Sequence, residues 1–97
     1  FSPDNDGFED VLLINYRLDD PGFFATIGIY DRRGRLIRQL ENNLLLGTEG
    51  TITWDGTTDN RSKARLGPHL ILIELFTPSG ETETYKLPCV VAGNLSN

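Results

Sequence analysis

Residues 23–41 read FFATIGIYDRRGRLIRQLE, and this stretch has the pattern of a β-hairpin. Before the turn, apolar side chains recur at every second position: Phe23, Ala25, Ile27 and Ile29. Such alternation places one face of a strand in a core. Asp31 and Gly34 stand where a type I turn prefers Asp and Gly, and Gly34 can take the left-handed conformation of a bulged hairpin. The stretch predicts two antiparallel strands, 23–30 and 35–41.

Four further segments have strand character. They are 11–18 (VLLINYRL), 51–55 (TITWD), 67–76 (GPHLILIELF) and 81–92 (ETETYKLPCVVA). Clusters of Asp, Pro, Asn and Gly separate them, as expected of turns. Pro88 interrupts the last segment and predicts a bulge or an unpaired edge, because proline has no N–H for a sheet ladder. Residues 42–50 are predicted to form a connection that crosses between two sheets.

Short strands separated by turns, without a long helical period, predict an all-β fold. We expect a single domain over residues 1–97, an immunoglobulin-like or fibronectin-III-like antiparallel β-sandwich of about seven strands. The alternation predicts a core formed by Leu12, Ile14, Tyr16, Ile27, Ile29, Ile52, Trp54, Ile71 and Ile73. The chain begins with Phe1 and contains no methionine, so we expect it to be a segment of a longer protein.

The composition is acidic, with 14 Asp and Glu against 9 Lys and Arg, and the formal net charge is −5. Nucleic acids and anionic lipids attract Lys and Arg, so an acidic chain is a poor partner for either. No apolar run approaches the roughly 18–20 residues that a transmembrane helix requires. We therefore expect no nucleic-acid partner and no membrane span, and a monomer when the domain is isolated.

The first ten residues, FSPDNDGFED, contain the strongest candidate for a metal site. Asp4, Asp6 and Asp10 place carboxylates around a glycine that can turn sharply, and calcium prefers six to eight oxygen ligands. Asp55 and Asp59 could reach the same ion across the fold. The spacing differs from that of an EF-hand and is closer to the short Asp-rich calcium loops of extracellular modules. The alternative is a solvated acidic turn that keeps the first strand from pairing with a neighbour.

The remaining chemically distinctive residues favour structural roles. Trp54 is in phase with Ile52, which predicts that Trp54 is a core residue. The alternative is an exposed platform on which sugars stack. His69 lies in an apolar strand, no serine lies in a Gly-x-Ser-x-Gly motif, and no nucleophile–base pair indicates an enzyme. Cys89 follows an apolar pattern and predicts a buried thiol. The arginines of segment 31–38 are expected to be solvated or paired with acids, with an acidic partner or a surface polysaccharide as the alternative.

Four stretches resemble one family. They are FSPDNDGFEDVL (1–12), IGIYDRRGRLIRQL (27–40), TITWDG (51–56) and GPHLILIEL (67–75). Together they resemble the Ig-like domain of the flagellar hook-capping protein, a kind of module also found near the C-termini of secreted and gliding-motility-type bacterial proteins. Two positions depart from the pattern. His69 stands where tyrosine is usual, and Asn60 could supply a left-handed residue where a glycine is usual.

The resemblance implies a non-catalytic structural or accessory module in an extracellular or cell-surface bacterial protein. Such a module would act as a spacer, an attachment domain or an assembly surface, and bound calcium would brace its entrance. Its partners would be other domains of the parent chain or a surface or secretion component. Two alternatives remain open. In a C-terminal sorting domain, residues 85–97 would be read by the export machinery, whereas a carbohydrate-binding module would expose Trp54 or Tyr30.

Overall fold

The computed structural model describes Phe1 and residues 11–92, and within this part all regular structure is β-strand. The strands are β1 (Leu12–Arg17), β2 (Phe24–Asp31), β3 (Leu36–Leu45), β4 (Glu49–Trp54), β5 (Gly67–Phe76) and β6 (Thr82–Val91). The all-β prediction is confirmed, with six strands in the described part against about seven predicted. The same residues contain no helix long and apolar enough to cross a membrane.

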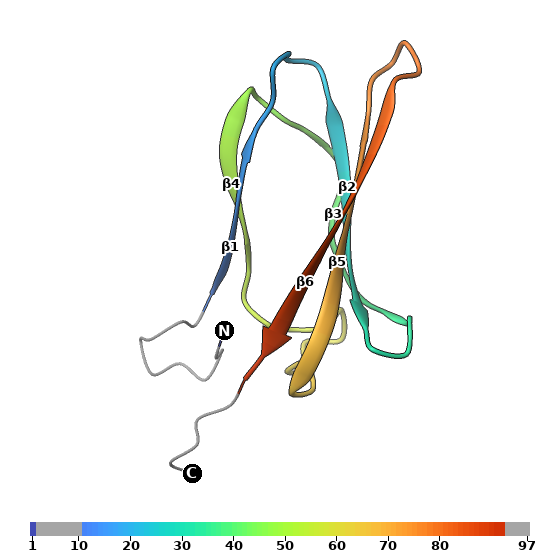
Figure 1. Cartoon of the computed structure of the whole chain (residues 1–97). Coiled ribbons are helices and arrows are strands. Elements are labelled where there is room, and N and C mark those ends of the chain that lie inside the picture. The colour runs from blue at the N-terminus through green and yellow to red at the C-terminus, as the bar shows by residue number, and fades with distance from the viewer. Residues whose placement is uncertain (2–10, 93–97) are drawn as a thin grey trace.

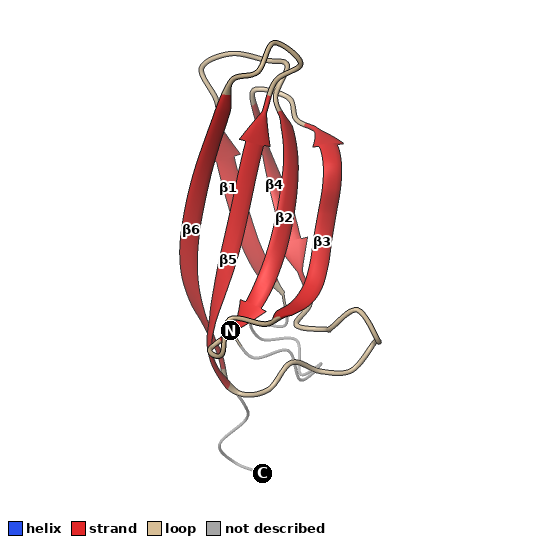
Figure 2. Ribbon diagram, turned by 90° about the vertical axis from the view of Figure 1, so that its right-hand side faces the viewer, coloured by secondary structure: helices blue, strands red, loops and turns tan. Residues whose placement is uncertain are grey.

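The strands form two antiparallel sheets that face each other across an apolar core (Figure 1). One sheet has two strands, in the order β1-β4, and the other has four, in the order β3-β2-β5-β6. Figure 2 shows the smaller sheet behind the middle of the larger one, whose margins are formed by β6 and β3. The unequal sizes of the two sheets leave part of the larger sheet uncovered.

The β2–β3 hairpin has the predicted turn. Gly34 adopts a φ of +82°, and its N–H donates to the carbonyl of Asp31 at 2.9 Å. The Asp31 carboxylate accepts bonds from the backbone N–H of Arg33 at 2.9 Å and of Arg35 at 3.0 Å. Because a carboxylate that accepts backbone bonds is stabilised in its charged form, the bond from Arg35 in particular lowers the pKa of Asp31.

The prediction of a connection over residues 42–50 is wrong in its length. Strand β3 continues to Leu45, and β4 begins at Glu49. Register shifts between β2 and β3 keep the end of β3 paired with β2. At this irregularity Asn43 adopts a φ of +56°, and its N–H donates to Thr26 Oγ1. Leu44 then pairs with Ala25. The remaining link crosses from one sheet to the other, as predicted.

The predicted core is confirmed. Six of its residues are buried, namely Ile14, Ile27, Ile29, Ile52, Trp54 and Ile71. The other three, Leu12, Tyr16 and Ile73, are partly buried against the same cluster. Trp54 is only 1% exposed, and its indole N–H donates to the carbonyl of Thr57 at 2.9 Å. This bond satisfies the polar atom that burial of a tryptophan would otherwise leave unpaired.

Both margins of the larger sheet carry features that hinder further pairing. The N–H of Ala92 donates to Phe1 and the carbonyl of Val90 accepts from Phe1, so these peptide groups point away from β5. Bonding alternates along an antiparallel pair, so Pro88 belongs to the same outward set, where its missing N–H disrupts no ladder. This confirms the predicted edge position. On β3, Asp59 covers the edge by bonding Ile37 and Gln39.

Candidate functional site

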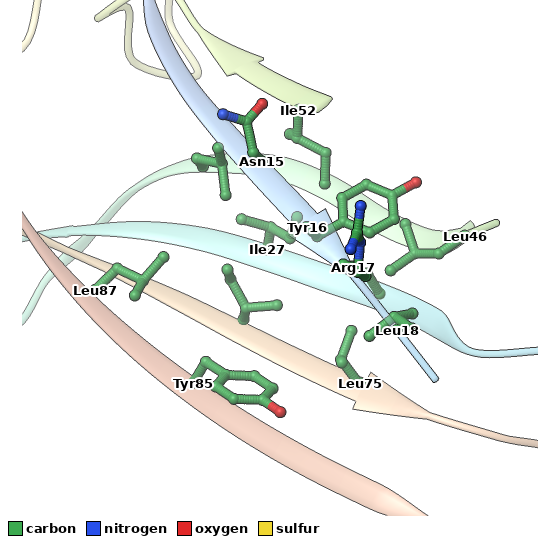
Figure 3. A pocket seen from close by; sticks show the side chains of 13 residues that line it. Asn15, Tyr16, Arg17, Leu18, Ile27, Leu46, Ile52, Leu75, Tyr85 and Leu87 are labelled. Atoms are coloured by element: carbon green, nitrogen blue, oxygen red, sulfur yellow. The ribbon is translucent and has the colours of Figure 1, made fainter. Parts of the chain in front are cut away.

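The uncovered part of the larger sheet borders an apolar cleft of about 280 Å³ between the edge strands β1 and β6. Figure 3 shows its lining side chains, which come from both sheets. Tyr16 and Leu18 belong to the β1 side, while Ile73, Tyr85 and Leu87 belong to β5 and β6. We call this region the open side.

The β6 wall of the open side is exposed although it continues the core face. Tyr85 and Leu87 pair directly with Ile73 and Ile71 of β5, so their side chains lie on the same face of the sheet. Yet Tyr85 is 47% exposed and Leu87 is 39% exposed. The Tyr85 hydroxyl donates to Glu83 Oε2 at 3.0 Å, and this bond raises the pKa of Tyr85. The phenol therefore stays uncharged at neutral pH.

The β1 wall of the open side has a free backbone edge. The N–H of Leu18 donates to the carbonyl of Thr48, the residue just before β4, at 2.7 Å. This bond shows which residues of β1 direct their peptide groups toward β4. Because bonded and non-bonded positions alternate, the peptide groups of Leu13, Asn15 and Arg17 point away from β4. In the described part of the chain no strand pairs with them. The edge thus offers donors and acceptors beside an apolar cleft.

Tyr16 holds its place in the cleft wall because Gly50 has no side chain. A Cβ atom at Gly50 would lie 2.6 Å from the Tyr16 hydroxyl and 2.8 Å from its Cζ atom. These two residues are cross-strand neighbours on β1 and β4. The absence of a side chain at this position therefore lets the Tyr16 ring lie over the neighbouring strand.

Phe1 binds the end of β6, beyond the residues that line the open side. Its amino group donates to the carbonyl of Val90 at 2.7 Å, and its carbonyl accepts from the N–H of Ala92 at 2.8 Å. This bonding pattern is that of a parallel bridge between Phe1 and Val91. The Phe1 ring meets Trp54 edge-on, with centroids 5.3 Å apart. One residue of extended chain is thus bound to a sheet edge with its side chain between the two sheets.

The predicted calcium ligands Asp4, Asp6 and Asp10 lie outside the described residues. Asp55, proposed to assist them, accepts bonds from the Thr57 hydroxyl at 2.6 Å and from its N–H at 3.0 Å, which lowers the pKa of Asp55. Asp59 bonds the edge of β3 as described above. Within residues 11–92 and Phe1, no three His, Cys, Asp or Glu side chains are grouped as a metal site requires.

The structure decides between the two roles considered for Trp54, a core residue and a sugar-stacking platform. Burial of Trp54 makes its role as an exposed stacking surface wrong. Tyr30 is partly buried and lines a hollow together with Leu70 and Lys86. The carbohydrate-binding alternative therefore depends on Tyr30 alone.

His69 and Cys89 are cross-strand neighbours in the larger sheet. His69 is 6% exposed, and its Nδ1–H donates to the carbonyl of Gly67 at 3.0 Å. Cys89 is partly buried, less than predicted, and burial raises the pKa of its thiol. A raised pKa keeps the thiol protonated and unreactive. Both residues thus have structural surroundings.

The arginine segment behaves as predicted. Arg35 Nε forms an ion pair with Asp31 at 3.0 Å, and Arg38 Nε lies 3.8 Å from Asp59. Arg32 and Arg33 are exposed at the hairpin tip, and neither makes a salt bridge with any described acid. The residues are therefore partly paired and partly solvated.

In the loop after β4, the expectation for Asn60 is wrong, because the left-handed residue is Arg61, with a φ of +68°. The Asn60 side chain instead accepts bonds from the Thr58 hydroxyl and the Ser62 N–H. A residue that bonds its own loop in this way stabilises the turn without needing a positive φ itself.

The open side is not predicted by the sequence. Alternation of Tyr85, Leu87, Cys89 and Val91 indicates an inward face on the last strand. That signal is present in the sequence, but it does not show whether a second sheet covers the face. Comparison with protein-family models, with curated proteins and with solved structures finds no match to this chain.

Proposed function

We propose that this chain is a non-catalytic structural module of the immunoglobulin-like or fibronectin-III-like kind. It attaches to other polypeptides through its open side, as part of a secreted or cell-surface bacterial protein. The observation that carries the proposal is the exposure of Tyr85 and Leu87 beside the free edge of β1. Exposed apolar surface next to unpaired backbone is typical of interaction sites.

The surroundings of the chemically reactive side chains support a non-catalytic role. The imidazole of His69 is buried and bonded to a backbone carbonyl, and the thiol of Cys89 is kept protonated by burial. A catalytic base or nucleophile requires access and a pKa suited to proton transfer. Both residues instead contribute to the packing of β5 against β6.

The resemblance to hook-capping and secreted Ig-like domains supports the extracellular location. Calcium bound by Asp4, Asp6 and Asp10 would brace the entrance to β1, as in extracellular modules whose weak sites fill only where calcium is abundant. The module has 97 residues, a length at which a single core can fold without a metal. Calcium would therefore add stability without being needed for folding.

The test uses the native protein in its own cells. Antibodies raised against residues 1–97 should label intact cells or the culture medium, and surface protease should remove the label. Labelling seen only after lysis would contradict the proposal. Leu87→Lys in the genomic copy should release the protein from its attachment while its amount is unchanged. Leu13→Lys, on the outer face of β1, is the matched control and should leave attachment intact.

A further inference from the structure

We propose that a β-strand from a partner polypeptide completes the open side. It pairs with the free edge of β1 and places every second side chain into the cleft. This inference rests on the proposed function, because it names what the attachment surface binds. The partner is an extended segment whose inward side chains are uncharged and apolar.

The choice of edge follows from the backbone. Asp59 covers β3 at Ile37 and Gln39, and Pro88 interrupts the outward set of β6. Strand β1 instead presents Leu13, Asn15 and Arg17 in an unbroken series, beside the apolar cleft. A strand added there would enlarge the smaller sheet and lie opposite the exposed part of β6. Main-chain bonds would supply affinity, and the alternate side chains would supply specificity.

Phe1 shows how extended chain binds next to the open side. Its backbone bonds Val90 and Ala92, while its ring enters the space between the sheets and meets Trp54. The cleft lies farther along, between Tyr85 and Leu18, and neither Phe1 nor Trp54 lines it. Phe1 pairs with the end of β6, whereas the proposed strand pairs with β1, so Phe1 shows only that extended chain with an apolar side chain is accommodated between the two sheets.

The direction of the added strand follows from the same contact. Phe1 runs parallel to β6, and β6 runs opposite to β1 (Figure 1). A partner strand in the same direction is antiparallel to β1, which is the pairing that β1 already makes with β4. It enters at the Arg17 end of β1 and finishes near Phe1. Its backbone bonds are then made to Leu13, Asn15 and Arg17.

The cleft volume limits what the strand inserts. A cavity of about 150 Å³ accommodates one benzene-sized group, so 280 Å³ accommodates about two apolar side chains of moderate size. The lining near β6 is Ile73, Tyr85 and Leu87, which carry no charge at neutral pH. Arg17 also lines the cleft, on the β1 side, and its guanidinium already pairs with Glu49 at 3.5 Å. A charged side chain on the inward face would lose hydration without gaining a partner. The partner segment therefore alternates, with Val-, Leu- or Ile-like residues facing inward.

The probe is the peptide acetyl-TVTVTVTVT-amide, titrated into the isotopically labelled chain and followed by NMR. In an antiparallel pair, the outward threonines supply the N–H groups that bond β1, and the valines enter the cleft. We expect amide exchange to slow at Leu13, Asn15 and Arg17, and the resonances of Tyr85 and Leu87 to shift. A peptide with proline in place of each threonine is the matched control, because it keeps the valines and lacks those donors.

Two variants test the surface. Leu87→Lys places a charge in the cleft wall and should weaken peptide binding by about tenfold or more. Leu13→Lys changes a side chain that is 59% exposed on the outer face of β1 and should bind as the parent chain does. Leu87 is 39% exposed, and neither Leu87 nor Leu13 belongs to the buried core cluster. Unchanged Trp54 emission confirms that each variant is folded.

Four outcomes would overturn the inference. The first three are no exchange protection at millimolar peptide, binding that maps to another edge, and equal binding by Leu87→Lys. The fourth is protection of β1 that is seen only when the same strand is fused ahead of Phe1. The cleft would then bind a strand of the same chain and not one of a partner. If Leu87→Lys is released from cells but the parent chain binds no peptide, the proposed attachment stands and only the strand addition is rejected.

Discussion

The ring of Phe1 meets the indole of Trp54 at an interplanar angle of 60°, with ring centroids 5.3 Å apart. This edge-to-face contact joins the first residue of the chain to the residue that ends β4. Phe1 also bonds the backbone at both sides of Val91. One residue therefore closes the core at the end where β6 finishes.

Phe1→Ala is expected to destabilise the fold by about 2 kcal/mol, because it removes a partly buried ring and an aromatic contact worth about 0.5–1.5 kcal/mol. Urea unfolding measures the change. Leu66→Ala is the control, since Leu66 is 70% exposed and its truncation should cost less than about 0.5 kcal/mol. Equal losses for the two variants would mean that Phe1 does not close the core.

Trp54 should have blue-shifted fluorescence that acrylamide quenches poorly, because the indole is 1% exposed. Unfolding in urea should shift the emission to longer wavelength and restore quenching. The chain contains one tryptophan, so the signal needs no assignment. Red emission from the folded chain would contradict the buried position and revive the sugar-stacking role of Trp54.

Gly50→Ala is expected to destabilise the fold by about 1–3 kcal/mol, because the new methyl group overlaps the Tyr16 ring and must displace it. Displacement of the ring should also change the NMR shifts of the cleft residue Leu18. Gly47→Ala is the matched control, since its Cβ would lie 3.9 Å from the carbonyl oxygen of Glu49, an ordinary van der Waals contact. If both alanine variants are equally stable, Tyr16 does not lie over Gly50 in solution.

Asp31 should make the stability of the β2–β3 hairpin depend on acid pH. Backbone bonds from Arg35 and Arg33 lower the folded-state pKa below the reference value of 3.8. A lowered carboxyl pKa contributes stability that is fully present above the unfolded-state pKa and is lost as the pH falls through the folded-state pKa. Unfolding free energy should therefore decrease on acidification from about pH 4 downward.

Asp31→Asn should flatten this part of the pH profile, whereas Asp20→Asn removes one exposed loop charge as a control. The carboxyl carbon shift of Asp31, followed by NMR, gives the midpoint directly. A midpoint at or above 3.8 would show that the turn bonds to the Asp31 carboxylate are not formed in solution.

Calcium should raise the thermal midpoint of the chain if Asp4, Asp6 and Asp10 bind it. At 100 times the dissociation constant, binding adds about 2.7 kcal/mol to the folded state. Scans in EDTA, in millimolar calcium and in millimolar magnesium measure the effect, and Asp6→Ala should abolish it. An unchanged midpoint in calcium would identify FSPDNDGFED as a solvated acidic turn.

Strand positions and turns could be predicted from the sequence because their signals are local. The alternation in 23–30, the Asp31–Gly34 turn and the in-phase Ile52 and Trp54 each reflect bonds or burial within a few residues. The core followed from the same alternation, since a period of two places one set of side chains on one face. Pro88 indicated an edge because proline lacks a donor.

The tertiary structure alone decided how the strands divide into sheets of two and four, and hence which edges stay free. The pattern of Tyr85 and Leu87 shows that they share a face, but pairing between distant strands decides what lies opposite them. The length of β3 and the left-handed Arg61 likewise depend on distant pairing or on loop bonds. By itself, the sequence determined the strands, their turns and their inward faces. Only the packing of unequal sheets produced the open side, because a face is covered or exposed according to strands far away along the chain.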